Sequence, residues 1–581
     1  MKVQRWTIAS LLLALLLGPG AFWEGLYAPA RQVASAMVLA AAVLVLRSDE
    51  DSYSPVELGA TTLLVGGVAL SLLHPAATGV AVHGPAVVVG WLLARALGRR
   101  LAENAPALRL ANLTLALAAA AMPVAGLIAL PWATPHHSGR LAAFLGYPIA
   151  VGVLGLVGAI AALPFAAERR RWAPLLLFAG SLGIWLSGSR GVWAVGLAAA
   201  AWLLWAPRDW VKRAWLPVLS AAAATLWFGP YVTTRAWSWA PDPGWFLGRA
   251  TVLDGSAVER ATFLRDGFRL VLEHPWGAGF RAWTALHLQG ASYNYYAAEV
   301  HSAPLDLALA FGWAGGAAFL VLLVLFGLKL LANGRRYDDA TFALLTGAGA
   351  MAVHALVDWD LSYGLFAVLL WFAFGVAQSG TVRFRFEWSA ALAGLTLAAG
   401  LLLTAGDVAV SLGDGALQRA EYAGARRHGL MATRIIPWDD AAHRVLGEAL
   451  RRSGDSDGAL PVLARARRLG PREPLYAELH ARALLESGQF VAAAQAYHDA
   501  VRLWPWWVPV YERALELHMD LVMRLELMGR PDEATQVFNS GRAILADLAR
   551  QQAREPAQSP RKQMITGTAT LQRAQAFFAP N

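Results

Sequence analysis

The chain has 581 residues, of which 57% are hydrophobic and only 15% are charged. Too few polar residues remain to cover a soluble globule of this size, so most of the chain is expected to lie in a lipid bilayer. The formal net charge of +9 comes from short basic clusters between apolar runs, which argues against a nucleic-acid partner, and the absence of cysteine excludes disulfides, thiolate metal sites and a cysteine nucleophile.

Apolar runs of spanning length occupy most of the chain up to residue 406. The first ends at Gly25, the second begins at Val33, and the others lie at about 55–73, 78–97, 106–130, 141–164, 171–187, 190–206, 214–230, 303–332, 340–357, 361–379 and 388–406. We therefore predict an all-α, polytopic membrane helical bundle of about 12–13 spans. Its N-terminal transmembrane helices lie in 1–230 and its C-terminal transmembrane helices in 303–406.

Lysine and arginine fall in every second loop, which is typical of loops that remain in the cytoplasm. The basic loops contain Lys2 and Arg5, Arg47, Arg95 to Arg109, Arg169 to Arg171, Arg208 to Arg213, Arg335 and Arg336, and Arg383 and Arg385. The alternate loops hold little positive charge apart from Arg31, Arg140 and Arg190. The pattern predicts a multi-pass protein of the cytoplasmic (inner) membrane, with 231–302 and everything beyond about 407 on the extracytoplasmic side.

The string SGSRGVW places a charge between two apolar runs. Arg190 stands at the start of the second run, next to Gly188 and Gly191, and Ser187 or Ser189 can cap the helix that follows. A guanidinium beside the free N–H groups of a helix start forms an anion pocket that a pyrophosphate would fit. The alternative is an arginine that only anchors the hairpin at the membrane surface.

The aqueous insert at 231–302 carries three further arginines of interest. Arg260 lies fifteen residues before the proline of an HPWGAG turn, Arg265 follows on the same predicted helix, and Arg281 comes after the turn. From the sequence alone, these side chains could all be solvated charges on an amphipathic helix.

The insert ends at His301, which is followed by Ser302 and the next apolar helix. An imidazole can accept the proton of an attacking hydroxyl or help to hold a phosphate leaving group without any metal. The alternative is a histidine that is only a hydrogen-bonded cap at a helix start.

Asp358 and Asp360 have the Asp-x-Asp spacing with which many glycosyltransferases hold a divalent cation on a nucleotide sugar. Nucleotide sugars are cytoplasmic, whereas the predicted orientation places these carboxylates on the outer face. We therefore interpret the segment as packing or pocket wall, and we predict no metal and no other cofactor.

From Gln418 onward the chain becomes polar, rich in arginine and helical in pattern. GDSDGALPVLARARRLGP and GQFVAAAQAYHDAVRLWP align without a gap, so that Gly454 matches Gly488 and Pro471 matches Pro505, at the 34-residue period of tetratricopeptide repeats. The period predicts an α-helical solenoid.

The repeats divide the rest of the chain into two predicted parts. A tetratricopeptide-like solenoid is expected at 418–552, and a flexible tail at 553–581. Stacked repeats form a concave surface that can hold a protein partner, or they only support the membrane domain.

The order of these motifs resembles the O-antigen ligase and polymerase family of membrane glycosyltransferases. The family has a Ser-x-x-Arg-Gly hairpin, then an arginine that leads into a short helix ending at a Pro-x-Gly-x-Gly turn, and a histidine before the following transmembrane helix. The resemblance covers about the middle third of the chain and implies a membrane fold similar to that of lipid-carrier glycosyltransferases. The chain departs from the family at Ser302, where an asparagine usually follows the histidine.

The resemblance implies a metal-independent glycosyltransferase that moves a glycan from undecaprenyl diphosphate to an acceptor hydroxyl at the outer face of the membrane. It further implies that Arg190 and Arg260 neutralise the diphosphate, while His301 assists the acceptor or the leaving group. The remaining predicted substrate contacts are Ser189, Ser302, Arg281 and Arg265, the last of which could take the place of Arg260.

The acceptor is left open, because a lipid, a glycan and a protein all present hydroxyls. The chain could therefore be a ligase, an O-antigen or exopolysaccharide polymerase, or a protein O-oligosaccharyltransferase, and the repeats favour a protein or partner-assisted acceptor. Two non-enzymatic alternatives are a lipid-linked glycan transporter, which the few charges inside the apolar runs argue against, and a membrane scaffold, which needs far fewer spans.

Overall fold

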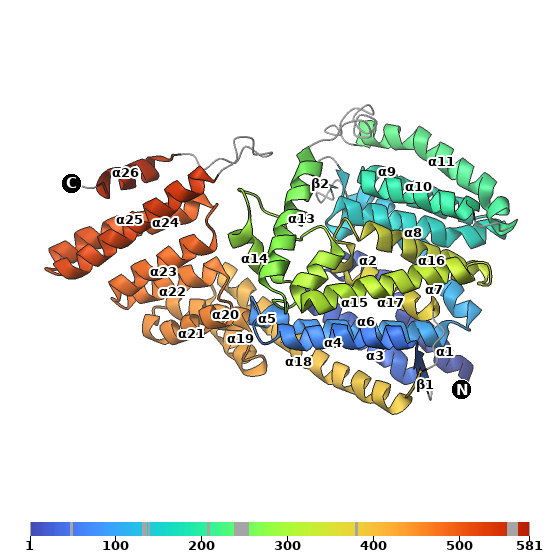
Figure 1. Cartoon of the computed structure of the whole chain (residues 1–581), viewed down its shortest axis with the longest axis horizontal. Coiled ribbons are helices and arrows are strands. Elements are labelled where there is room, and N and C mark those ends of the chain that lie inside the picture. Colours follow the sequence, from blue (N-terminus) through green and yellow to red (C-terminus); the bar gives the residue numbers. More distant parts are fainter. Residues whose placement is uncertain are drawn as a thin grey trace.

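The computed structural model describes residues 2–46, 50–129, 136–137, 140–205, 209–236, 255–377, 382–554 and 567–579. This part of the chain is built almost wholly from helices, with two short two-stranded sheets (Figure 1). The predicted all-α bundle is therefore confirmed. Within the predicted insert, 237–254 lie outside the described residues.

Each predicted apolar run coincides with a helix. Before the insert these helices are α1 (Lys2–Leu17), α3 (Pro29–Leu46), α4 (Pro55–Ser71), α6 (His83–Leu101), α7 (Ala105–Ala129), α8 (Pro148–Ala167), α9 (Ala173–Ser187), α10 (Arg190–Trp205) and α11 (Asp209–Ala236). After it they are α15 (Ala303–Asn333), α16 (Asp339–His354), α17 (Gly364–Ala377) and α18 (Phe386–Gln418).

Length and composition separate these helices into groups. Among the described residues, 7 helical stretches are long and apolar enough to cross a membrane, and α4, α9, α10 and α17 are shorter apolar helices. Helices α11 and α16 fall outside both groups. The chain is a multi-pass membrane protein.

Helix α8 lies among α7, α9 and α16, and nearly all of its residues are buried. A Cβ on Gly158 would collide with Ala119 of α7, and one on Gly155 would lie 2.6 Å from the carbonyl oxygen of Gly180 in α9. Small residues at these crossings allow the backbones to approach closely, as is common between membrane helices. This packing fixes the position of α9 and of the hairpin that follows it.

The insert contains α13 (Gly255–Glu273) and α14 (Ala282–Gly290), joined by the HPWGAG turn. The turn is bonded to α15, which leaves helical geometry at Gly312. The kink frees two carbonyl groups of α15 for other donors. The carbonyl of Leu309 accepts from the Ala278 N–H at 2.8 Å, and that of Ala310 accepts from Gly279 at 3.0 Å. The insert is thus held on a membrane helix by main-chain hydrogen bonds.

Short elements complete the bundle. They are α2 (Pro19–Phe22), η1 (Glu24–Leu26), α5 (Thr78–Ala81), β2 (His136–His137), β3 (Arg140–Leu141), η2 (Ala143–Leu145) and η3 (Asp360–Ser362). At the end of the bundle away from the insert, β1 (Glu50–Tyr53) pairs antiparallel with β4 (Val382–Arg385), so that Glu50 lies opposite Arg385 (Figure 1).

The polar C-terminal part is a stack of helices at the other end of the bundle (Figure 1). Its helices are α19 (Tyr422–Ile435), α20 (Asp440–Arg452), α21 (Ser456–Leu469), α22 (Pro474–Glu486), α23 (Phe490–Leu503), α24 (Val508–Leu527) and α25 (Pro531–Ala553). The matched residues Gly454 and Gly488 both have positive φ, +88° and +76°, in the turns before α21 and α23. Equivalent positions therefore have equivalent geometry, and the tetratricopeptide assignment remains a prediction.

The C-terminal stack, 418–552, is packed against the insert. Buried side chains of α13 and α14 share one hydrophobic core with those of α22, α23 and α24. The indole N–H of Trp506 donates to the carbonyl of Ala291 at 3.0 Å, and the Gly79 N–H at α5 donates to Asp440 Oδ1 at 2.7 Å. The C-terminal stack and the start of α15 therefore both bury apolar surface against the insert.

The predicted flexible tail needs a correction for its described part. Ala569–Phe577 form helix α26, which packs on α24; Leu571 within the helix and Phe578 directly after it are buried. Leu571, Ala574 and Phe578 recur at helical spacing, and they supply the apolar surface that this helix buries. Residues 555–566 of the tail lie outside the described residues.

Candidate functional site

Asp358, in the loop between α16 and η3, joins two of the predicted site residues. A guanidinium nitrogen of Arg260 in α13 donates to its Oδ2 at 3.1 Å, and Nδ1 of His301 lies 3.3 Å from its Oδ1. The Asp358 side chain is 1% exposed, whereas His301 is 15% and Arg260 is 33% exposed. The carboxylate is therefore a buried anchor for two groups that keep access to solvent.

The charge of Asp358 is set by these neighbours. Burial alone would raise the pKa of this carboxyl group, but the contact with His301 and the positive charge of Arg260 outweigh burial and lower the pKa to about 2. Asp358 is therefore ionised at neutral pH. The His301 Nδ1 is within ion-pair distance of Asp358 but does not meet hydrogen-bond geometry. With Nδ1 directed to the carboxylate, Nε2 is the nitrogen available for chemistry.

The backbone around His301 is held in an unusual conformation. Its φ is +59°, in the left-handed region that costs a non-glycine residue on the order of 1 kcal/mol or more. The Ala303 N–H donates to the carbonyl of Ala355 at 2.9 Å, which joins the start of α15 to the end of α16. Ser302 is buried at the N-cap of α15, but its side chain makes no capping hydrogen bond. The strained residue is therefore fixed beside Asp358 by a link between α15 and the end of α16.

Aromatic rings enclose this cluster. Phe263 stacks on the His301 ring at 5.5 Å, and Trp359 meets the same ring edge-on at 6.1 Å. Tyr147, which precedes α8, lies 4.5 Å from Trp359 and also contacts Arg260. Burial and the charge of Asp358 raise the pKa of Tyr147, so its hydroxyl stays protonated.

The SGSRG hairpin connects α9 to α10. Gly188 has φ +55° and ends α9, and the Ser189 hydroxyl accepts from the Val192 N–H at 3.4 Å. Ser189 therefore caps α10, as the sequence predicts. Arg190 is the first residue of this helix and is partly buried.

The hairpin lies directly against the end of α16. A Cβ on Gly191 would be 2.9 Å from Nε2 of His354, and Nδ1 of His354 lies 2.6 Å from Oδ2 of Asp360. His354, Asp358 and Asp360 belong to one short segment. This segment meets the hairpin through His354 and binds Arg260 through Asp358. The structure thus brings the hairpin of Arg190 and the pair Arg260–His301 to the same end of α16.

Arg140 is a member of this region that the sequence reasoning missed. Its Nε donates to the carbonyl of Ser187 at 2.5 Å, and its charge acts on Tyr147. The sequence shows Arg140 only as an exception in a loop otherwise poor in positive charge. An arginine in a loop of this kind was the sequence feature that could have identified Arg140 as part of the site.

The other two predicted arginines have different surroundings. Arg265 is 69% exposed and donates to the Ser292 hydroxyl at 2.8 Å, away from Asp358. Arg281 is buried, lies 3.6 Å from Glu299, and covers the ring of Tyr27 at 4.1 Å. Of the arginines in the insert, the structure brings Arg260 to His301, whereas Arg281 already has a buried anionic partner.

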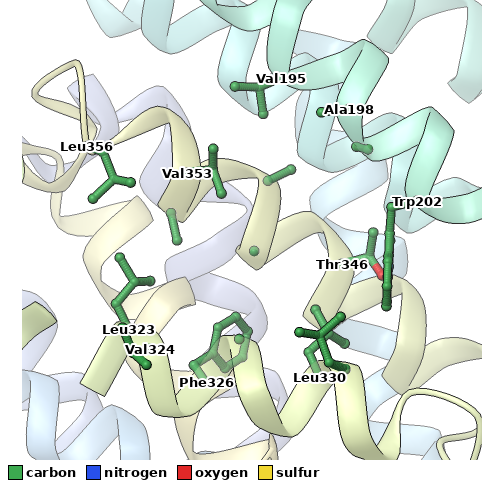
Figure 2. Close-up of a pocket in the computed structure, with 16 residues that line it drawn as sticks. Val195, Ala198, Trp202, Leu323, Val324, Phe326, Leu330, Thr346, Val353 and Leu356 are labelled. Carbon is green, nitrogen blue, oxygen red and sulfur yellow. The ribbon is translucent and has the colours of Figure 1, made fainter. Parts of the chain in front are cut away.

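An apolar cavity of about 440 Å³ begins next to this region and extends along the membrane helices (Figure 2). Val195 and Trp202 of α10, Phe326 and Leu330 of α15, and Val353 of α16 are among the residues that line it. Val195 is about one helical turn beyond Gly191, and Val353 adjoins His354. The cavity therefore starts at the polar end of the bundle and is apolar along its length.

Comparison with known proteins gives one family match. Residues 174–320 match the family model described as O-Antigen ligase. The matched stretch runs from α9 into α15, so it includes Arg190, Arg260 and His301 but not Asp358. A search of curated proteins finds no match to the chain.

Proposed function

We propose that this membrane protein with an O-antigen ligase domain at residues 174–320 is a glycosyltransferase that moves a glycan from undecaprenyl diphosphate to an acceptor hydroxyl. The observation that carries the proposal is the meeting of Arg260 and His301 on one ionised carboxylate, Asp358. This arrangement provides a cation for a phosphate leaving group and a base for a hydroxyl within one cluster.

In the proposed step, the acceptor oxygen attacks the anomeric carbon of the glycan. The bond from that carbon to the diphosphate oxygen breaks, its electron pair goes to the diphosphate, and the acceptor proton passes to Nε2 of His301. Asp358 holds the imidazole through Nδ1 and compensates the positive charge that the ring gains. Proton transfer and departure of the leaving group are thereby assisted from adjacent side chains.

The leaving diphosphate gains charge as it departs, and the proposal assigns this charge to two arginines. Arg260 presents a partly exposed guanidinium beside Asp358, and Arg190 begins α10, where free N–H groups also favour an anion. A planar guanidinium can donate two parallel hydrogen bonds to phosphate oxygens. Such contacts strengthen in the transition state and so increase the rate.

The polyprenyl chain of the carrier would lie in the apolar cavity between α10, α15 and α16. Its lining is almost entirely hydrocarbon, and Val195 at one end of it lies about one helical turn from the SGSRG hairpin. A lipid with a charged head and a long apolar tail matches this combination of neighbouring surfaces.

The proposed reaction needs no metal ion. Asp358 and Asp360 have the spacing of a cation site, but Asp358 is engaged by Arg260 and His301, and Asp360 by His354. Both carboxylates therefore have other partners. We also propose that the insert and the C-terminal stack face the outside of the cytoplasmic membrane, on the basis of the basic loops.

The test uses the full-length protein in lipid vesicles with an undecaprenyl diphosphate-linked glycan and a panel of lipid, glycan and protein acceptors. We expect Arg260→Ala and His301→Ala to lower transfer by about 10²–10³-fold, because each group acts on charge that develops in the transition state. Arg265→Ala is the matched control on the same helix and should retain transfer. Full activity of His301→Ala, or activity abolished by a chelator, would show that the mechanism is wrong.

A further inference from the structure

A second polar cavity lies away from Asp358, where the insert meets the C-terminal stack. Its volume is about 270 Å³. The lining side chains that matter to the argument are Arg269, Glu273, His274, Gln289, Arg472 and Arg554. They come from α13, α14, the α21–α22 loop and the end of α25, so the cavity exists only when the insert and the stack are docked.

The cavity carries an excess of positive charge. Three guanidinium groups converge on it, and its lining includes one carboxylate, Glu273, which lies 3.7 Å from Nε of Arg269. Among the described residues, Arg472 and Arg554 have no ion pair. Burial and the charge of Arg472 lower the pKa of His274, so this ring adds no charge at neutral pH.

Two buried donors at the cavity lack an acceptor. These are Nε of Arg269 and the amide nitrogen of Gln289. Other atoms of both side chains do have partners. Another guanidinium nitrogen of Arg269 donates to the carbonyl of Gly290, and the amide oxygen of Gln289 accepts from Arg472 at 2.9 Å. An unsatisfied buried donor is destabilising, and a bound anion would supply the missing acceptor.

We propose that this cavity binds a carboxylate or phosphate group of the acceptor glycan. The identity of the ligand as an acceptor rests on the proposed glycosyl transfer, whereas the cavity and its charge do not. Arg269 follows Arg260 by nine residues on α13, which is about 14 Å along the helix axis. An acidic acceptor bound here would therefore lie along the helix that leads to His301. The lining is mostly polar, which favours a glycan over a phospholipid headgroup with its acyl chains.

The test measures binding to the full-length protein in detergent, without any donor. The probe is a hexuronate-containing tetrasaccharide, and the reference probe is the same tetrasaccharide after reduction of its carboxyl groups. We expect Arg472→Glu and Arg554→Glu to weaken binding of the acidic probe at least 10-fold. Arg468→Glu is the matched control, because Arg468 is exposed near the end of α21 and the substitution changes the charge equally.

The proposal is overturned if the acidic probe does not bind, if the reduced probe binds equally well, or if Arg468→Glu weakens binding as much as Arg472→Glu. Binding of phosphatidylglycerol vesicles that the tetrasaccharide does not displace would identify a headgroup site and overturn the proposal. The variant His301→Ala should bind the probe normally. Normal probe binding by the native protein, if that protein shows no transfer activity, would contradict the proposed function alone, and transfer by the native protein without probe binding would contradict this inference alone.

Discussion

At the scale of single residues, Asp358 determines how the candidate site is organised. Its carboxylate is 98 residues from Arg260 in the chain and receives that guanidinium at 3.1 Å. Arg190, Arg260 and His301 could be selected from the sequence because each belongs to a local motif. Asp358 could not be assigned this role, because its partners come from distant segments and its spacing to Asp360 suggested a cation site.

We expect Asp358→Asn to lower transfer by on the order of 10²–10⁴-fold, because asparagine keeps the shape of the side chain but cannot compensate a protonated His301. The measurement is the transfer rate in vesicles at saturating acceptor. Asp457→Asn, at an exposed position in α21, is the control for loss of a carboxylate.

The same variant tests the charge of Asp358 through stability. The folded-state pKa of about 2 lies below the roughly 3.9 of an unfolded aspartate. The carboxylate therefore contributes stability that is fully present above about pH 4 and is lost as the pH falls toward 2. The difference in Tm between the native protein and Asp358→Asn should shrink over that interval. A difference that is unchanged from pH 6 to pH 3 would mean that the pKa is not lowered.

At the scale of elements, the sequence predicts the helices well but not the kink in α15. Apolar runs of spanning length are read directly from composition, and each coincides with a helix. Gly312 lies within such a run, and no local pattern distinguishes it from Gly327 further along the helix. The kink depends on the HPWGAG turn, whose N–H groups bond to the freed carbonyls.

We expect Gly312→Ala to destabilise the protein by about 1–3 kcal/mol, because φ at this position is +75° and the added Cβ would lie 2.7 Å from the carbonyl oxygen of Pro275. Gly327→Ala is the matched control in the same helix, since a Cβ there meets nothing within 4 Å. Thermal unfolding in detergent gives the comparison. Equal Tm values for the two variants would show that the turn does not require the kink.

At the scale of the whole molecule, the docking of the C-terminal stack on the insert could not be predicted from the sequence. The 34-residue spacing identifies repeating units, but it does not indicate which surface each unit buries. Trp506 is 1% exposed and donates to Ala291 of the insert. Part of the surface of the C-terminal stack is thus covered by the chain's own insert.

We expect Trp506→Ala to loosen the insert, because removal of a buried tryptophan costs about 3–5 kcal/mol. Hydrogen exchange of α13 and α14 should become faster, while exchange in α8 should not change. Leu527→Ala is the control, since Leu527 is 90% exposed in α24. Unchanged protection of α13 and α14 would mean that the stack does not support the insert.

The bonds between the stack and the rest of the chain also limit where the stack can gain or lose units during evolution. Asp440 accepts a hydrogen bond from Gly79, and Trp506, about two 34-residue periods further along the chain, donates one to Ala291. If a unit were duplicated between these two positions, Asp440 or Trp506 could no longer reach its hydrogen-bond partner. A unit added beyond α24 would leave both hydrogen bonds in place. We therefore expect natural length variants to differ at the distal end, so that the number of units changes while the distance between Asp440 and Trp506 along the sequence is kept.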